Sequence, residues 1–272
     1  MQKTKEILQL TIKGFLGKEV GKRAASLTYY LVFAIFPFII SLISLLGFLH
    51  LPMISLEGDA AAFLPADVIT LLNLTIAHMT ETSNGAILTF GLAFTLWFPY
   101  RAVKNLTDEV SDIYGEEKPI GHTKRILILS FFILILIPVM LILMIIGESV
   151  LDFVAQFLPI TSQFIAIWTK ARFLPMAIAL ILLISAIYYF SPNRPPAWGF
   201  ILPGALLSTA LWMVYSFGFS YYVDNMGNYS VIYGSIGAII AFLIWLNWSM
   251  TALLLGAVFN QALREANKKE VE

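Results

Sequence analysis

The chain has 272 residues, of which 59% are hydrophobic and only 12% are charged, whereas a soluble domain carries about 25% charged residues. This composition excludes an ordinary soluble protein and predicts an all-α, polytopic integral membrane protein, because helices satisfy their own backbone hydrogen bonds within lipid. The chain has no cysteine, which excludes disulfides, thiolate metal sites and a cysteine nucleophile.

Residues 1–23 combine six lysines and arginines with apolar residues in a pattern that suits an amphipathic helix on an anionic membrane surface. A solvated N-terminal arm is the alternative. The segment does not have the form of a cleavable signal peptide, because its basic residues are spread out and no small-residue cleavage site follows a short apolar core. We therefore expect it to stay attached.

Long uncharged runs predict six spanning helices, because about 20 apolar residues suffice to cross a bilayer. The last span lies in a run of 39 residues without a charge, from Asn225 to Leu263. The second span is expected to continue as a helix beyond the membrane, through Tyr114, and to end at Gly115. The predicted bounds are about 27–49, 85–104, 126–147, 173–190, 197–220 and 231–258.

Two segments between the spans are too polar or too interrupted to cross the membrane. Residues 65–79 begin with a proline and place apolar residues along one stripe, which predicts a short interfacial helix. Residues 148–170 contain acidic residues and Pro159 and are expected to form a loop or an interfacial helix. The whole chain, 1–272, is thus predicted to be one six-span transmembrane domain.

The distribution of positive charge predicts the orientation. Six spans place both termini on the same side of the membrane. If that side is the cytoplasm, 15 of the 17 lysines and arginines fall in cytoplasmic segments. Positive residues are strongly enriched on the cytoplasmic side, so both termini are expected to be cytoplasmic.

Prolines and small residues indicate how the spans contact one another. Pro37 and Pro203 each remove a backbone donor and would free the carbonyl oxygens of Phe33 and Gly199. Small residues four apart on the last span allow another helix to approach closely. That face has two interpretations, ordinary packing or the lining of a substrate path. Expected buried polar side chains are Tyr29, Tyr30, Asn247 and Asn260. The other candidate cavity or helix-contact residues are Pro37, Asn105, Asp108, Pro203, Gly204, Tyr233, Gly234, Gly237 and Gly256.

Five cations are expected near the cytoplasmic interface. They have two interpretations, topological anchors or ligands for lipid phosphates and an anionic substrate. Arg101 ends the shortest span, so we expect a partner, Asn105 or Asp108, to hold it inside the protein. The five candidate headgroup ligands are Arg23, Arg101, Lys104, Arg125 and Arg194.

The sequence offers little for catalysis. The one cluster of carboxylates, Asp108, Asp112 and Glu116, has the spacing of a solvated helix face, although metal-dependent nucleases do use clustered carboxylates. The three histidines fall in separate segments and make no metal site. No phosphate-binding glycine motif or basic, aromatic-studded surface occurs. We therefore predict no enzyme, no metal, no cofactor and no nucleic-acid partner.

Four parts of the chain carry a family resemblance. They are residues 24–37; residues 96–97, 101, 105 and 113–115; residues 202–204 and 212; and residues 233–237 and 255–257. Together they resemble the YihY/BrkB family of bacterial inner-membrane proteins, whose members were once labelled ribonuclease BN. The resemblance implies six helices, cytoplasmic termini and an inner-membrane location, but no particular activity. The family often has an acidic residue where this chain has Val258, so a role for that carboxylate is not carried over.

These features favour a membrane transporter or translocator of an anionic amphiphile, such as a lipid or a lipid-linked envelope precursor. Broken helices with cations at their ends receive anionic groups in transporters. The expected cavity is walled by spans one, five and six, and the expected partners are membrane lipids. A non-transporting envelope-maintenance or scaffold membrane protein is the alternative, and a cavity would distinguish the two.

Overall fold

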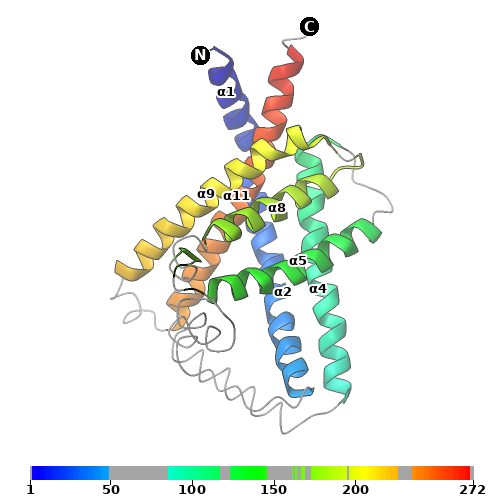
Figure 1. Cartoon of the computed structure of the whole chain (residues 1–272). Helices are drawn as coiled ribbons and strands as arrows, with labels where there is room; N and C mark the ends of the chain where they lie inside the picture. Colours follow the sequence, from blue (N-terminus) through cyan, green and yellow to red (C-terminus); the bar gives the residue numbers. More distant parts are fainter. Residues whose placement is uncertain are drawn as a thin grey trace. The chain divides into compact units, whose positions relative to one another are not determined.

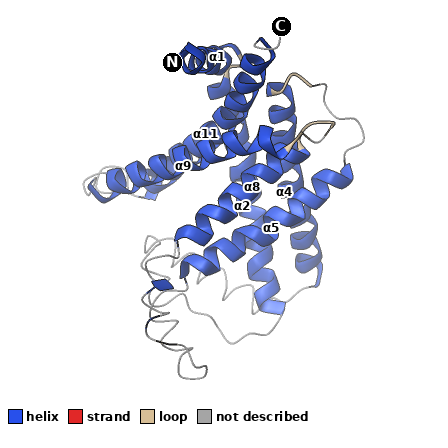
Figure 2. Cartoon of the chain, turned by 45° about the horizontal axis from the view of Figure 1, so that its top comes forward, coloured by secondary structure: helices blue, strands red, loops and turns tan. Residues whose placement is uncertain are grey.

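A computed structural model describes most of the chain, and helices occupy nearly all of the described residues (Figures 1 and 2). It describes residues 2–48, 85–116, 123–145, 173–194, 196–225 and 235–269, together with 161, 163, 167 and 168. The helices are α1 (Gln2–Gly17), α2 (Val20–Phe48), α4 (Gly85–Ile113), α5 (Thr123–Ile145), α8 (Phe173–Phe190), α9 (Trp198–Asn225) and α11 (Ser235–Lys269). No strand occurs in these ranges, so the all-α class is confirmed for them.

Six of these helices, α2, α4, α5, α8, α9 and α11, overlap the six segments predicted to be spans. Within the described ranges, two helical segments are long and apolar enough to cross a membrane, Trp198–Tyr222 and Ile239–Lys268. Leu174–Phe190 forms a shorter apolar helix. The predicted interfacial segment 65–79 and most of 148–170 lie outside the described residues.

The chain divides into two compact units. The first contains Met1–Ala24, Val103–Tyr215 and Ser249–Glu272, and the second contains Ala25–Ala102 and Ser216–Trp248. Helices α2, α4, α9 and α11 each contribute residues to both units. The polar contacts that bear on function lie mostly in the first unit.

Within the first unit, α5 packs against α8 (Figures 1 and 2). Helix α1 contacts α11, because a Cβ added to Gly14 would lie 2.8 Å from Cγ1 of Val258. Val258 is buried, so an apolar contact occupies the position at which the family pattern often has an acid. Helix α1 and the last turns of α11 lie at the same end of this unit (Figure 1).

Helix α4 ends where the sequence predicts. Gly115 has a φ of 70°, a left-handed conformation that glycine adopts without strain. Its N–H donates to Asp112 O at 3.0 Å, and the N–H of Glu116 donates to Ser111 O at 3.1 Å. This pair of bonds is a Schellman motif, which satisfies carbonyl groups at the helix end.

The junction between α1 and α2 is a tight turn with an unusual backbone. Glu19 has a φ of 50°, which is uncommon for a residue with a side chain. Its carbonyl accepts from the N–H groups of Lys22 at 2.9 Å and Arg23 at 3.2 Å, at the start of α2. The turn therefore fixes the positions of Lys18 and Arg23 on either side of it.

Candidate functional site

A buried asparagine joins α11 to α9 and to the end of α4. Asn260 is 0% exposed. Its Oδ1 accepts from Gly204 N at 2.7 Å, and its Nδ2 donates to Ile201 O at 3.2 Å and to the Tyr114 hydroxyl at 3.3 Å. Pro203 lies between Ile201 and Gly204, so Asn260 binds backbone groups on both sides of the proline. The carbonyl that the missing N–H frees is a different one, that of Gly199, four residues before Pro203. These contacts favour packing over a substrate handle as the role of Asn260.

Helices α9 and α11 touch most closely at Gly204 and Gly256. A Cβ on Gly256 would overlap Gly204 O and Ser208 Oγ, and would lie 2.6 Å from the Tyr188 hydroxyl. The Tyr188 hydroxyl donates to Leu253 O at 2.5 Å and lies 2.8 Å from Ser208 Oγ, with which it shares a hydrogen bond. The small-residue face of the last span is therefore closed by another helix at this level, which matches its packing interpretation.

A groove opens beside Pro203, between the first turns of α9 and the last turns of α11. Its volume is about 870 Å³. Among the described residues, its walls combine apolar surface with two cations and an amide, and contain no carboxylate. The lining residues are Gly199, Phe200, Pro203, Leu263, Arg264, Asn267 and Lys268. It is a cavity beside one of the two prolines singled out in the sequence.

Arg264 is held at this groove by aromatic contacts. Its guanidinium carbon lies 5.8 Å from the centroid of the Phe200 ring, within the range of a cation–π interaction. The Tyr114 ring meets Phe200 edge-on, with centroids 5.2 Å apart. Tyr114 is buried, and burial raises the pKa of its hydroxyl, so that it stays neutral while it accepts from Asn260. In the sequence, Arg264 and Lys268 are distinguished only as two of the positive charges expected on the cytoplasmic side.

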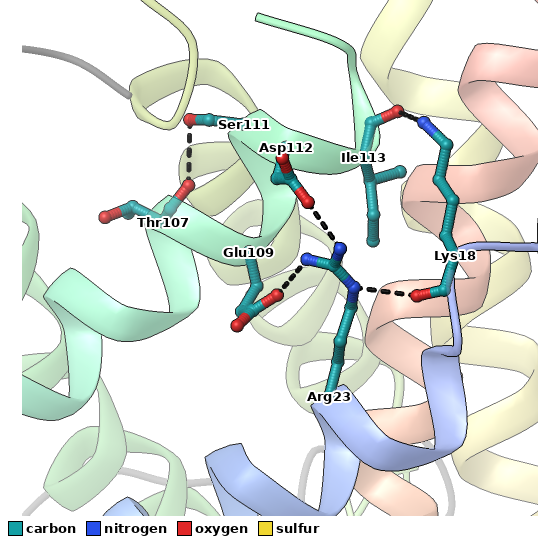
Figure 3. Close-up of polar contacts among 7 residues, drawn as sticks. All are labelled: Lys18, Arg23, Thr107, Glu109, Ser111, Asp112 and Ile113. Carbon is teal, nitrogen blue, oxygen red and sulfur yellow. Dashed lines mark hydrogen bonds and ion pairs between the residues drawn. The ribbon is translucent and has the colours of Figure 1, made fainter. Parts of the chain in front are cut away.

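A second cationic region lies at the junction of α1 and α2 (Figure 3). The Arg23 guanidinium forms ion pairs with Glu109 and Asp112, near the end of α4. Its Nε donates to Lys18 O at 2.7 Å. The Lys18 ammonium donates to the carbonyl of Ile113 at the last residue of α4. We call these five residues the Arg23 cluster.

The Arg23 cluster neutralises its own charge. Burial alone would lower the pKa of Arg23, but hydrogen bonds and attraction from Glu109 and Asp112 outweigh it and raise the pKa. The Arg23 side chain is only 26% exposed, so its charge serves the contact with α4. Lys18 is different, because burial lowers its pKa although Glu265 and Asp112 oppose the shift.

The other predicted headgroup cations are not brought together with Arg23. Arg101 is exposed, and its guanidinium carbon lies 5.9 Å from the Trp97 ring centroid, one turn earlier on α4. The expectation that Asn105 or Asp108 holds Arg101 inside the protein is therefore wrong. The Arg101 side chain is exposed and contacts the exposed Trp97 ring instead. Arg125 donates to Asn193 O at 3.1 Å, and Arg194 is exposed. Lys104 is half-buried.

Two of the expected buried polar groups are at the surface. Tyr29 and Tyr30 are 59% and 36% exposed, with ring centroids 5.7 Å apart. Adjacent residues on a helix point in different directions, so the two rings do not share one buried face. Asn105 and Asp108 are half-buried. The Nδ2 of Asn105 is buried, with no hydrogen-bond partner in the described part of the chain.

A smaller groove, of about 350 Å³, lies in the second unit between α2 and α11. Asn247 lines it, and Gly237 is buried further along α11. Pro37 falls within α2, while Tyr233 and Gly234 lie outside the described residues. Neither of these two grooves is lined by α2, α9 and α11 together, so neither is the cavity expected between spans one, five and six. The full lining is Ala25, Thr28, Ile240, Leu243, Ile244, Asn247 and Trp248.

The carboxylates whose spacing in the sequence raised the possibility of a metal cluster form structural contacts. Asp112 pairs with Arg23, and Glu116 Oε2 accepts from the backbone N–H of Asn193 at 2.9 Å. In the part of the chain that is described, no three acidic or histidine side chains are placed to hold a metal. All three histidines lie outside that part.

Comparison with known proteins gives relatives of two kinds. YfkH of Bacillus subtilis (strain 168), which is named a ribonuclease-like protein, is 29% identical over 256 residues, 92% of each chain. A UPF0761 membrane protein of Aromatoleum aromaticum is 24% identical over 269 residues, 95% of this chain and 64% of that protein. A UPF0761 membrane protein of Tolumonas auensis is 39% identical over 79 residues, 29% of this chain and 26% of that protein.

This chain thus spans less than two thirds of the length of those two UPF0761 proteins, whose names describe membrane proteins and state no enzymatic reaction. No solved structure matches the chain. The sequence profile of the family described as virulence factor BrkB matches residues 11–272. Since this match covers nearly the whole chain, the protein belongs to the BrkB family, whose UPF0761 relatives are membrane proteins.

Proposed function

We propose that the protein crosses a bacterial inner membrane six times, with both termini in the cytoplasm. Six helices overlap the segments predicted to be spans, and the charge bias favours this orientation. An even number of spans also suits the position of α1 and the last turns of α11 at the same end of the first unit. Reporter fusions at Asn73 and Tyr114 test the topology. A cytoplasmic signal at Asn73 or an extracytoplasmic one at Tyr114 contradicts it.

We further propose that the protein translocates an anionic amphiphile, such as a lipid or a lipid-linked envelope precursor. The groove beside Pro203 is the observation that carries this proposal. It combines apolar walls with cations at one end, as a molecule with a charged head and an apolar tail requires.

The arrangement suggests how headgroup and tail would be separated. Arg264 and Lys268 would attract the charged head at the end of α11, while Pro203 and Leu263 would contact the apolar portion. The Asn260 contacts hold the backbone of α9 to α11 on both sides of Pro203, which fixes this wall of the groove.

A membrane scaffold without transport is the second candidate, and one observation favours it. Helices α9 and α11 are in close contact at Gly204 and Gly256, which leaves no passage between them at that level. A scaffold needs such rigid contacts, whereas a translocator must also allow movement. We assign no ribonuclease activity, because Asp112 and Glu116 are engaged in structural contacts.

A flux assay distinguishes the two candidates. The purified full-length protein is reconstituted in phosphatidylcholine vesicles that contain a fluorescent anionic lipid, and the rate of its transfer between leaflets is measured. The translocator is expected to accelerate transfer over protein-free vesicles, and Arg264→Gln combined with Lys268→Gln is expected to slow it. If no anionic lipid moves faster with the wild-type protein under any ion gradient, the scaffold replaces the translocator.

A further inference from the structure

Among the described residues, two cations of the groove have no acidic partner, in contrast to Arg23. Arg264 and Lys268 are four residues apart on α11 and therefore share a face, and both are exposed at the groove. Neither forms an ion pair with any residue that the structure describes. The nearby Glu265 carboxylate instead accepts from Gln261 Nε2 at 3.1 Å, on the same helix. Two positive charges thus face the groove without compensation.

The groove also has aromatic neighbours of the kind that are typical of the headgroup level of a membrane. Trp198 precedes the lining residue Gly199, is exposed, and stacks on Tyr189 with ring centroids 5.8 Å apart. Exposed tryptophan and tyrosine are enriched at membrane–water interfaces. Beyond the groove, α9 exposes Leu202 and Leu206, which offers apolar surface to an acyl chain. Headgroup and tail would therefore meet cations and apolar residues in the order that a bilayer imposes.

We propose that this groove binds a lipid with a terminal phosphate monoester, with Arg264 and Lys268 on the phosphate. A phosphate monoester carries a charge of about −1.5 to −2 near neutral pH and three acceptor oxygens, which two cations match. A phosphodiester headgroup carries a single charge and would leave one cation uncompensated. The planar guanidinium binds two phosphate oxygens at once, and its contact with Phe200 orients it before the lipid arrives.

This inference rests on the proposed function, because it names the class of lipid that the translocator would move. The experiment that tests it measures lipid binding alone. The full-length protein in detergent is titrated with phosphatidic acid, phosphatidylglycerol and phosphatidylcholine of identical acyl chains, and bound lipid is counted by native mass spectrometry. Phosphatidic acid is expected to bind about tenfold more tightly than phosphatidylglycerol. R264Q and K268Q are each expected to weaken phosphatidic acid binding about tenfold and to leave phosphatidylcholine binding unchanged.

K124Q is the matched control, because Lys124 is also an exposed lysine but does not line the groove. Equal affinity for phosphatidic acid and phosphatidylglycerol overturns the inference, and so does an equal loss in K124Q and K268Q. If R264Q fails to fold, R264K replaces it, since lysine keeps the charge but loses the planar fork and is expected to give a smaller loss.

Inorganic phosphate distinguishes a lipid site from a site for a free anion. Displacement of phosphatidic acid by an equal concentration of inorganic phosphate overturns the lipid assignment, because the apolar walls would then contribute nothing. Selective binding without flux in vesicles keeps this inference and rejects the translocator. Flux without any preference for the monoester keeps the translocator and overturns this inference.

Discussion

Two cationic regions of the first unit use the same residue types for different purposes. In the Arg23 cluster, one guanidinium meets two carboxylates and one carbonyl, and the neighbouring lysine meets another carbonyl (Figure 3). At the groove, Arg264 meets only the face of Phe200 among the described residues. The charges of the Arg23 cluster balance one another without a ligand, whereas the described residues at the groove leave two positive charges unbalanced.

This difference changes how a cation near a membrane should be interpreted. Position alone made Arg23 a headgroup candidate, because it lies at the boundary of a predicted span. Its partners lie 86 and 89 positions away in the sequence, so only the fold shows that its charge is already matched. A cation becomes a better ligand candidate when it is exposed, oriented and without an acidic partner, as Arg264 is.

The largest expected effect tests whether the groove rests on a rigid crossing of α9 and α11. In Gly256→Ala the new Cβ would overlap Gly204 O, a backbone atom that cannot easily move. Forcing extra atoms into a packed contact destabilises by about 1–3 kcal/mol. We therefore expect the free energy of unfolding to fall by about 2 kcal/mol, measured by denaturation in detergent.

Gly218→Ala is the control for that substitution. Gly218 is likewise a helical glycine, in α9, but an added Cβ there would meet no atom within 4 Å outside its own stretch of helix. Alanine has the higher helix propensity by about 0.8–1.0 kcal/mol, so this variant is expected to be neutral or slightly more stable. Similar losses in both variants would show that the crossing at Gly256 is not tightly packed.

The second prediction compares the two arginines directly. Arg23→Ala leaves Glu109 and Asp112 without their partner, at 28% and 46% side-chain exposure. A fully buried pair broken in this way loses about 3–5 kcal/mol, but solvent screens these groups, so we expect a loss of about 1–2 kcal/mol. Arg264→Ala is expected to change stability by less than about 0.5 kcal/mol, as exposed substitutions usually do. Thermal and chemical unfolding in the same detergent check both.

A double-mutant cycle identifies the source of the Arg23 effect. If the ion pairs carry it, the loss in Arg23→Ala combined with Glu109→Gln is smaller than the sum of the two single losses, with a coupling of about 0.5–1 kcal/mol. Additive losses would instead assign the effect to packing of the arginine stem. A greater loss of stability in Arg264→Ala than in Arg23→Ala would contradict the structural role assigned to Arg23.

Much of the helical architecture follows from local features of the sequence. Apolar runs place α2, α4, α5, α8, α9 and α11, because a span requires a continuous apolar segment. Gly115 predicts the end of α4, because its backbone geometry is a local property. The contact face on α11 follows from the spacing of Ala252, Gly256 and Asn260.

The features that could not be predicted from the sequence depend on contacts between residues that are far apart in the chain. Tyr188 and Ser208 are polar residues within largely apolar segments, a weak signal whose meaning depends on their contact across helices. Tyr29 and Tyr30 have the same weak signal, yet they are exposed. Arg264 gains its importance from Phe200, which is 64 residues away. Spacing along one helix predicts a shared face but not the residue that lies opposite.

The smallest expected effect concerns the turn that positions Lys18 and Arg23. Glu19 occupies the left-handed region at a φ of 50°, where a side chain is strained and glycine is not. Its ion pair with Lys22 is exposed and contributes little. Glu19→Gly should therefore raise the unfolding temperature slightly, since relief of strain outweighs the lost pair and the greater flexibility of the unfolded chain. Glu19→Gln loses the same pair but keeps the strain, so it should lower that temperature slightly. If both variants shift it in the same direction, backbone strain does not dominate at this turn.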